Sequence, residues 1–471
     1  MIENLICKSD ISIKDVFILI DKNSHGTCFV VNEKSFLIGV ITDGDLRRAL
    51  LDGHDLSTPI IKIINKVYKY AKIDDDPQEI LRNLNDEIKI IPIVNRDGTI
   101  ADFASLNHLP FTPVATPDLY GNELKYLTDA FLSTWISSSG EYINRLENNF
   151  AKYCNTKYGS SVCNGTVALE LALKSIGVKP GSEVIIPDLT FAATINAVIH
   201  IGARPVIVDI EEDNWCISPH EIEQAISEKT AAIIPVHLYG QPASMDKICA
   251  IGKKYNIPII EDCAEAHGAS FNGKSVGSMG DVGCFSFFAN KIMTTGEGGI
   301  CVTNSRDIYE RMDILKNHGM SKEKKYWHEN PGFNFRMTNI QAAIGVAQLE
   351  RIDNMLAIRG HHEEKYKELF KNADINLTFQ ENFPERKRVV WLVCALTESS
   401  DLREELYCKM QNIKIDVRKV FYPLSDMPPY KQYAAKPCPI SKDISERGIS
   451  FPTFNNHLRL DDITKKINEN Y

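Results

Sequence analysis

The sequence predicts an α/β protein in which a mostly parallel sheet is sandwiched by helices, with an α+β repeat before it and a smaller α+β domain after it. Short strands that are apolar on both faces alternate with amphipathic helices through the middle of the chain, as in parallel sheets covered by helices. The N-terminal part repeats internally, and the C-terminal part returns to a helix–strand–helix pattern. These changes predict four segments, 1–110, a linker at 111–117, 118–355 and 356–471.

Composition and charge limit the classes of protein to consider. In 471 residues, 44% are hydrophobic and 24% charged, which is ordinary for a globular chain and excludes a largely disordered one. The formal charge of -9 does not indicate the excess of basic residues that nucleic-acid-binding proteins carry. No apolar run reaches the ~18 residues that a spanning helix needs, and the start, MIENLICKSD, has no secretory signal pattern. We expect a cytoplasmic protein with neither a nucleic-acid nor a membrane partner.

Cysteines and histidines show no metal-binding pattern. The twelve cysteines are scattered, no pair has C-x-x-C spacing, and several lie in apolar runs such as VGCFSFF. Such thiols behave as small buried hydrophobic groups. His361 and His362 are adjacent, so on a helix they point to different faces, which argues against a zinc pair. We therefore expect no metal.

The N-terminal repeat consists of two strand–turn–strand–helix copies. Residues 29–46 read FVVNEKSFLIGVITDGDL and residues 92–109 read PIVNRDGTIADFASLNHL, and a helix-like stretch precedes each copy. The two copies resemble a tandem CBS module, with GVITDGDLRRAL as the most similar stretch. We therefore expect an α+β CBS pair over 1–110.

The CBS resemblance implies that Thr42 and Asp45 contact the ribose of an adenine nucleotide. An aspartate can accept hydrogen bonds from both ribose hydroxyls. In the second copy Ala104 and His108 stand at the matching positions, so at most one nucleotide site is expected. The alternative is that the module only packs or dimerises and that Asp45 caps a helix.

After a proline-rich linker, PFTPVATP, the chain alternates between strands and helices. Helical patterns such as TVALELALKSIGV and SMDKICAIGKKYN lie between most of the strands, and LAIRGHHEEKYKELF and VVWLVCAL predict a helix and a strand in the last domain. The predicted strands of the sheet are 184–189, 204–210, 231–240, 257–262, 282–288 and 298–304.

Two charged residues follow apolar strands, where open α/β sheets bind their ligands. Asp262 ends IPIIED, and a carboxylate at a buried strand end needs a partner. Lys291 follows VGCFSFFAN in apolar surroundings, which favours a depressed pKa and imine chemistry. A lone lysine or aspartate also occurs as a surface residue or a helix cap, so the flanking motifs carry the argument.

Other side chains complete a candidate cofactor site. Gly165 and Thr166 open an amphipathic helix, whose free N–H groups and dipole make a phosphate seat. Ser286 lies near Lys291 in the chain, and Phe191 follows a strand end, where an aromatic ring could pack on a cofactor. An amine, an acid, a phosphate seat and an aromatic ring are the parts that pyridoxal 5'-phosphate requires.

Residues from about 117 to the C-terminus resemble the DegT/StrS-type sugar aminotransferases. The resemblance rests on NGTVALELAL, IIPDLTFAATINAV, IIEDCAEAHGA, GDVGCFSFFANKIMTTGEGG and PGFNFRMTNIQAAIGVAQLE. FSFFANKIMTTGEGG and VFYPLSDMPPY are most similar to the GDP-perosamine synthase branch. The resemblance implies a type I PLP aminotransferase fold with pyridoxal 5'-phosphate as the cofactor.

The resemblance also implies a role for each matching residue. Lys291 matches the imine-forming lysine, Asp262 the acid that pairs with the pyridine nitrogen, and Glu265 a position near the ring hydroxyl. Phe191 matches the stacking aromatic. The matching phosphate contacts are Gly165, Thr166 and Ser286.

Two more positions concern the assembly and the substrate. Asn334 in PGFNFRMTN matches an asparagine that reaches the phosphate of the neighbouring subunit, which implies a homodimer with shared active sites. Ser425 departs from the family, because members often have His after FYPL in a region that lines the sugar-nucleotide site.

The resemblance implies transfer of an amino group from L-glutamate to a nucleotide-linked keto sugar. GDP-4-keto-6-deoxymannose is the favoured acceptor, for surface glycan synthesis, and a UDP- or dTDP-linked keto sugar is the alternative. Two rival functions are a sugar dehydratase, which would lack Lys291, and a non-catalytic PLP-binding, nucleotide-sensing regulator. The presence of Lys291 counts against the dehydratase, and the intact set of Lys291, Asp262 and TTGEGG counts against the regulator.

Overall fold

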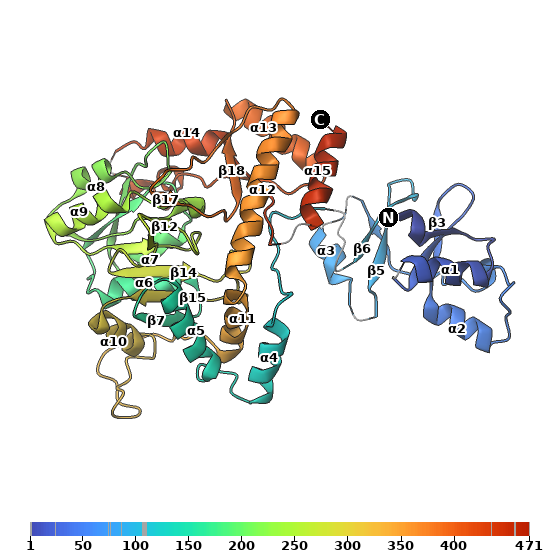
Figure 1. Ribbon diagram of the computed structural model, residues 1–471, viewed down its shortest axis with the longest axis horizontal. Coiled ribbons are helices and arrows are strands. Elements are labelled where there is room, and N and C mark those ends of the chain that lie inside the picture. Colours follow the sequence, from blue (N-terminus) through green and yellow to red (C-terminus); the bar gives the residue numbers. More distant parts are fainter. Residues whose placement is uncertain are drawn as a thin grey trace. The chain divides into compact units, whose positions relative to one another are not determined.

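The computed structural model describes residues 2–23, 25–73, 75, 77–85, 87–105, 111–434, 436–455 and 458–470. The chain forms two compact units, Met1–Thr112 and Pro113–Tyr471, both drawn in Figure 1. Among the described residues, no helix is long and apolar enough to cross a membrane.

The N-terminal unit contains two small sheets of identical topology. In the order β1-β2-β3, β1 and β2 are parallel and β2 and β3 antiparallel, and β4-β5-β6 repeats this arrangement. The elements are η1 (Ile2–Leu5), β1 (Ile6–Lys8), α1 (Ile13–Asn23), β2 (Thr27–Val31), β3 (Leu37–Thr42), α2 (Asp43–Leu51), η2 (Ile60–Lys62), β4 (Ala71–Lys72), α3 (Pro77–Arg82), β5 (Ile90–Val94) and β6 (Ile100–Ser105).

The predicted internal repeat is therefore confirmed at the level of its strands. A shared cluster of Leu5, Phe29, Ile90 and Phe103 joins the two copies, because each contributes apolar residues to it. The first copy continues from β3 into α2. The corresponding stretch of the second copy, with His108, lies outside the described residues.

The large sheet lies in the second unit. Its strands fall into two groups, β10-β8-β9 and β11-β14-β15-β7, which the parallel bridges of Ile233 with Ile259 and Val236 with Asp262 join. The strands are β7 (Tyr158–Val162), β8 (Glu183–Pro187), β9 (Arg204–Val208), β10 (Thr230–Ile233), β11 (Ile260–Asp262), β14 (Val282–Ser286) and β15 (Gly299–Thr303).

Within this sheet only β15 runs against its neighbours, β14 and β7; the other pairings are parallel. The mostly parallel sheet confirms the predicted fold class. The helices before and around it are α4 (Glu123–Leu132), α5 (Glu141–Tyr153), α6 (Gly165–Ser175), α7 (Ala193–His200), α8 (Pro219–Ala225), η3 (Leu238–Gly240), α9 (Met245–Tyr255), α10 (Arg306–Leu315) and α11 (Asn339–Leu349).

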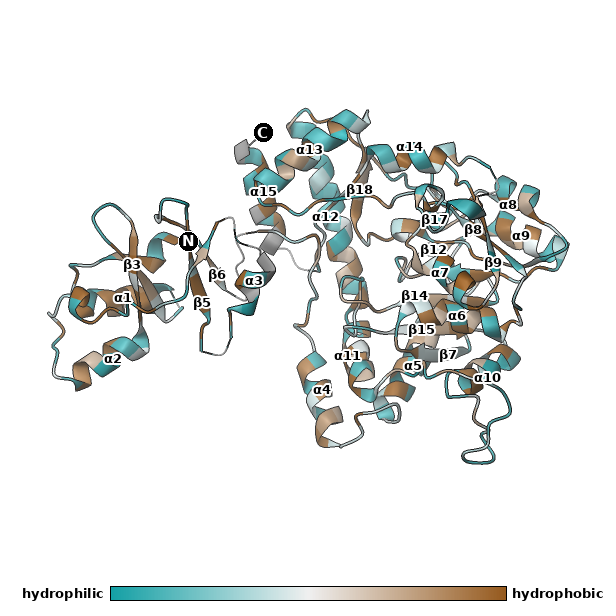
Figure 2. Cartoon of the chain, turned by 180° about the vertical axis from the view of Figure 1, so that it is seen from behind, coloured by the Kyte–Doolittle hydropathy of each residue, from teal (hydrophilic) through white to brown (hydrophobic). Residues whose placement is uncertain are grey.

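The sheet separates two apolar cores. Along β8, Ile185 contributes to one core, and its neighbours Val184 and Ile186 contribute to the other, because successive side chains of a strand point to opposite faces. Phe150 of α5 lies in the first core and Leu169 of α6 in the second. Figure 2 colours the chain by the hydropathy of each residue.

The C-terminal part carries an antiparallel sheet of its own, with strand order β16-β18-β20-β19. Its core contains Phe370, Phe451 and Ile463, and the long helix α12 leads into it (Figure 1). The elements are α12 (Ile352–Asn372), β16 (Thr378–Phe379), β18 (Val393–Leu396), α13 (Ser400–Asn412), β19 (Arg418–Lys419), η4 (Leu424–Asp426), η5 (Lys431–Tyr433), α14 (Pro439–Arg447), β20 (Gly448–Phe451) and α15 (Leu458–Asn470), and β12 (Ser270–Phe271), β13 (Lys274–Ser275) and β17 (Arg386–Lys387) form a third small sheet.

The segment expected to be a linker is partly packed. Val114 is buried, its N–H donates to Asp416 Oδ2 at 3.2 Å, and its carbonyl accepts from the N–H of Thr453 at 2.9 Å. The second unit therefore begins with Pro113, and Val114 is fixed to the C-terminal part of this unit.

Candidate active site

Lys291 lies in a largely buried space between a carboxyl group and an aromatic ring. Its side chain is 10% exposed, and its Nζ lies 3.7 Å from Glu265 Oε1 and 3.9 Å from the ring centroid of Trp391. Burial lowers the pKa of the Lys291 amine and raises the pKa of Glu265 to about 7, and in each case it outweighs the attraction of the partner. Burial therefore shifts the amine toward its neutral form, which is the nucleophilic one.

Asp262 ends β11 as a buried carboxyl group. Its Oδ2 accepts from the hydroxyl of Thr194 at 2.8 Å, and its Oδ1 accepts from the N–H of Ala264 at 3.2 Å. Burial raises the pKa of Asp262, although both hydrogen bonds and the charge of Lys291 oppose this shift. A buried acid at a strand end suits a partner that carries a protonated ring nitrogen.

The residues predicted to hold a phosphate come together at the start of α6. The side chain of Asn164 caps this helix by accepting from the N–H of Val167 at 3.0 Å, and the N–H groups of Gly165 and Thr166 find no acceptor among the described residues. A Cβ on Gly165 would lie 2.7 Å from Cβ of Ser286. Glycine thus leaves a small cradle beside Ser286, which fits a phosphate group.

Phe191 lies between β8 and α7 with 59% of its surface exposed. Its ring centroid is 5.9 Å from that of Phe421. An apolar ring this exposed beside a site has a face available for packing on a ligand. Its position agrees with the stacking role that the resemblance implies, and the role itself stays a prediction.

Asn334 lies in an exposed segment next to the chain that leads into α6. It forms an antiparallel bridge with Asn317, and its Oδ1 accepts from Arg336 Nη2 at 2.9 Å. The next residue, Phe335, accepts the N–H of Cys163 at 2.8 Å. Asn334 is therefore close in the fold to the phosphate seat and accessible to a second chain.

An aromatic cluster beside Lys291 was not predicted from the sequence. Tyr239 stacks on Trp391 and on Phe421, with centroid distances of 5.7 and 5.2 Å, and its N–H donates to Glu265 Oε2 at 2.8 Å. The sequence pattern indicated only a strand around Trp391, since the three rings come from distant segments. The available signal was the presence of tryptophan directly before a buried strand.

The unusual residue Ser425 has a clear structural partner. Its N–H and hydroxyl donate to the carboxylate of Asp188 at 2.7 and 2.9 Å, directly after β8. Burial raises the pKa of Asp188 to about 6. Ser425 thus fastens the FYPL segment, which contains Phe421, to the end of β8.

A second buried cluster, His237, Glu261 and Cys263, brings potential metal ligands within 4.8 Å of one another. The oxygens of Glu261 accept the N–H groups of Gly277, Met279 and Gly280, and His237 bonds to Glu261 at 3.1 Å. His237 Nδ1 also accepts the N–H of Ala243 at 3.1 Å. These bonds occupy both oxygens of Glu261 and both ring nitrogens of His237, so the cluster fixes residues 277–280 next to β11.

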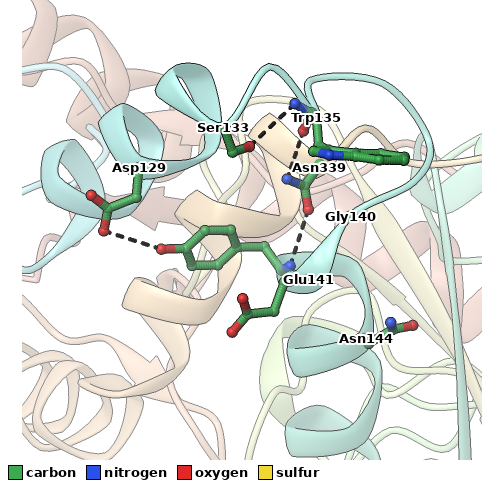
Figure 3. A pocket seen from close by; sticks show the side chains of 8 residues that line it. Asp129, Ser133, Trp135, Gly140, Glu141, Asn144 and Asn339 are labelled. Atoms are coloured by element: carbon green, nitrogen blue, oxygen red, sulfur yellow. Dashed lines mark hydrogen bonds between the residues drawn. The ribbon is translucent and has the colours of Figure 1, made fainter.

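A separate open pocket of about 600 Å³ lies between α4 and α5 (Figure 3). Asn339 organises it by donating to the carbonyl of Trp135 at 2.7 Å and accepting the N–H of Tyr142 at 3.0 Å. Gly140 is required here, because its Cβ would lie 2.3 Å from Asn339. Asp129 and Glu141 line the pocket.

In the N-terminal unit, Thr42 and Asp45 form a capping box at the start of α2. Asp45 Oδ2 accepts from the N–H and hydroxyl of Thr42 at 2.8 and 2.7 Å, and its Oδ1 accepts from Arg48 at 2.6 Å. This geometry therefore agrees with the alternative in which Asp45 caps a helix. A nucleotide contact at Asp45 stays a prediction.

The mostly parallel sheet, with a buried lysine, a strand-end acid and a phosphate cradle, defines a pyridoxal-phosphate-dependent aminotransferase of fold type I. Residues 117–469 match the DegT/DnrJ/EryC1/StrS aminotransferase family, and residues 1–52 match the CBS domain. The chain belongs to this aminotransferase family, whose members are PLP-dependent transaminases.

Relatives are similar over nearly their whole length. The GDP-perosamine synthase of Escherichia coli O157:H7 is 43% identical over 346 residues, 74% of this chain and 94% of that protein. The GDP-perosamine synthase of Caulobacter vibrioides is 41% identical over 350 residues, again 74% and 94%. The crystal structure of S. venezuelae DesV matches with a TM-score of 0.70 and 31% identity, covering 76% of this chain and 98% of that one.

Proposed function

We propose that the protein transfers the amino group of L-glutamate to C4 of GDP-4-keto-6-deoxymannose and so makes GDP-perosamine, in the cytoplasm, for surface glycan synthesis. The observation that carries the proposal is the position of the Lys291 amine, which is buried between Glu265 and the ring of Trp391 and has a lowered pKa. The GDP-linked acceptor is supported by two relatives more than 40% identical that are named GDP-perosamine synthases.

Each residue of the site would have its own role in holding the cofactor. Gly165, Thr166 and Ser286 would hold the cofactor phosphate, Phe191 would pack on its ring, and Asp262 would pair with its ring nitrogen. When bound, pyridoxal 5'-phosphate supplies an electron sink for the carbanion formed at the substrate carbon.

Lys291 would act as the acid and base of the reaction. As a neutral amine it can take the proton from the carbon that carries the amino group of L-glutamate. As the ammonium it can return a proton to C4 of the acceptor sugar. With a pKa raised to about 7, the carboxyl group of Glu265 beside Lys291 can gain or lose a proton near neutral pH.

We also propose that the enzyme is a homodimer whose active sites are shared, with Asn334 reaching the phosphate of the neighbouring subunit. The exposed position of Asn334 supports this arrangement. A second support is the apolar side of α4, coloured brown in Figure 2, where Leu124, Phe131 and Leu132 are 74%, 64% and 72% exposed. Sedimentation equilibrium would give twice the 53.0 kDa chain mass, whereas a monomer would contradict the shared site.

The function can be tested optically on the full chain loaded with pyridoxal 5'-phosphate. L-glutamate should bleach the visible absorption band, and GDP-4-keto-6-deoxymannose should restore it, while Lys291→Ala should do neither. Recovery only with a UDP- or dTDP-linked keto sugar would keep the transamination and replace the acceptor. A band that L-glutamate never bleaches would refute the aminotransferase and favour a cofactor-binding regulator.

A further inference from the structure

Arg359, on α12, is a buried guanidinium for which neither the sequence motifs nor the proposed reaction accounts. It is 1% exposed, and among the described residues no carboxylate forms an ion pair with it. Burial lowers its pKa to about 9. The charge of Asp118 opposes this shift from beyond ion-pair distance. Burying a charge without a direct ion pair is costly, so the hydrogen bonds of Arg359 have to offset much of that cost.

Both partners of Arg359 belong to the C-terminal part of the chain. Its Nη1 donates to the carbonyl oxygen of Trp391, and its Nε donates to Asn455 Oδ1 at 2.5 Å. Because Oδ1 of Asn455 accepts from Arg359, the amide is fixed in one orientation, with its NH₂ group facing away from the guanidinium.

Each partner in turn holds a carbonyl group next to Lys291. Trp391 Nε1 donates to the carbonyl of Asn290 at 2.8 Å, and Asn455 Nδ2 donates to the carbonyl of Ile292 at 3.1 Å. The residues on both sides of Lys291 are therefore linked, through Trp391 and Asn455, to the guanidinium of Arg359. The ring of Trp391 also lies under the Lys291 amine, 3.9 Å from Nζ to the ring centroid.

We infer that Arg359 is a positioning residue for Lys291: through Trp391 and Asn455 it fixes the two peptide carbonyls that flank the lysine and keeps the amine over the indole ring. The planar guanidinium suits this task, because its fork of donors binds two acceptors in fixed directions and a lysine at this position could not. The inference rests on the proposed role of Lys291. We assign Arg359 no contact with substrate or cofactor.

The test measures the Lys291 amine directly, in the full chain without cofactor. Competitive acetylation with acetic anhydride across a pH series, read by mass spectrometry of the Lys291 peptide, gives the pH at which the amine is half protonated. Arg359→Lys keeps a positive charge but lacks the planar set of N–H donors that binds both acceptors. We expect the Lys291 midpoint to rise by about one pH unit, because a loosened loop admits water and relieves the burial that lowers the amine pKa.

The matched control is Arg403→Lys, since Arg403 is another buried arginine and pairs with Glu404 on α13, away from the Lys291 loop. It should leave the midpoint unchanged. If Arg359→Lys does not fold, Asn455→Leu removes the bond to Ile292 and the acceptor of Arg359 Nε but keeps the path through Trp391, and it should shift the midpoint in the same direction by less. An unchanged midpoint in the folded Arg359 or Asn455 variant, or an equal shift in Arg403→Lys, overturns the inference.

This measurement is independent of the proposed reaction. A Lys291 that fails to react with pyridoxal 5'-phosphate would refute the proposed function, and the comparison of acetylation midpoints would still decide whether Arg359 positions it. Conversely, a normal transaminase in which Arg359→Lys leaves the midpoint unchanged would refute only the role of Arg359.

Discussion

Glu265 and Lys291 share one buried space, and burial favours the neutral form of each. With a folded pKa of about 7, Glu265 holds a proton that the unfolded chain releases at the ordinary carboxyl pKa near 4.5. The folded state therefore binds more protons in this window, and the stability of the cofactor-free protein falls as pH rises through it.

Glu265→Gln should remove this fall, because an amide does not titrate. We expect the variant to be more stable than the wild type above about pH 7, by about 3 kcal/mol, and to lose that advantage near the ordinary carboxyl pKa. Urea unfolding of the cofactor-free proteins at several pH values measures the difference. Stability curves that stay parallel across the window would contradict the raised pKa.

Gly165 and Gly360 offer a matched pair of glycines within helices. A Cβ at Gly165 meets Ser286 at 2.7 Å, whereas a Cβ at Gly360 meets nothing within 4 Å. We expect Gly165→Ala to destabilise the fold by about 1–3 kcal/mol and to weaken retention of the cofactor. Gly360→Ala should stabilise α12 by about 0.5–1 kcal/mol and leave retention unchanged. Equal cofactor loss in both variants would argue against a cradle at Gly165.

The residues of the candidate site differ in how visible they are in the sequence. Lys291, Asp262 and Phe191 stand in short motifs at strand ends, so their neighbours in the sequence indicated them. Trp391 and Arg359 act across the fold: the bond from Trp391 to the carbonyl of Asn290 joins positions 101 residues apart. No local period or spacing encodes such a contact, and only the folded chain brings these groups together.

At the scale of elements, β-branched apolar runs predicted the strands of the large sheet well, because strands buried on both faces have few polar positions. β7 is the exception. Its sequence, YGSSV, is small and polar, and it belongs to the sheet because it pairs with β15 over five residues. The Ser160 and Ser161 side chains are buried there, so the neighbouring strand, and not the local pattern, places this segment in the sheet.

The bond between η4 and the end of β8 should be sensitive to pH. Burial raises the pKa of Asp188 to about 6, so its contribution to stability falls as pH rises from the ordinary aspartate pKa to about 6. Ser425→Ala removes a hydroxyl that favours the charged form, and this raises the folded pKa further. We expect Ser425→Ala to lower the free energy of unfolding by about 1–3 kcal/mol above the folded pKa of Asp188 and by less below it.

Thermal unfolding of Ser425→Ala at about pH 5 and about pH 8 would measure this difference. Ser425→Thr is the control, since it keeps the hydroxyl donor to Asp188. The same loss at both pH values would show that the Ser425 hydroxyl supports the fold without reference to the charge of Asp188.

At the scale of the whole molecule, the chain combines an aminotransferase with a repeated N-terminal unit whose first copy matches the CBS domain. The topology of that unit could be predicted because its two copies have similar sequence patterns. Its ligand could not, because Asp45 can serve two purposes: it caps α2 through Thr42, and its Oδ1 pairs with Arg48 at 2.6 Å.

A ribose at Asp45 must therefore compete with Arg48, and this competition makes the predicted adenine nucleotide testable in the full chain. The Arg48 side chain is 69% exposed, and an exposed ion pair is worth about 1 kcal/mol or less, so Arg48→Ala should tighten binding of AMP by at most about fivefold. Asp45→Ala should weaken it. Calorimetric titration measures both. If neither the wild type nor Arg48→Ala gives heat of binding, Asp45 serves only as a helix cap. If Arg48→Ala binds AMP more weakly than the wild type, Arg48 contacts the phosphate instead.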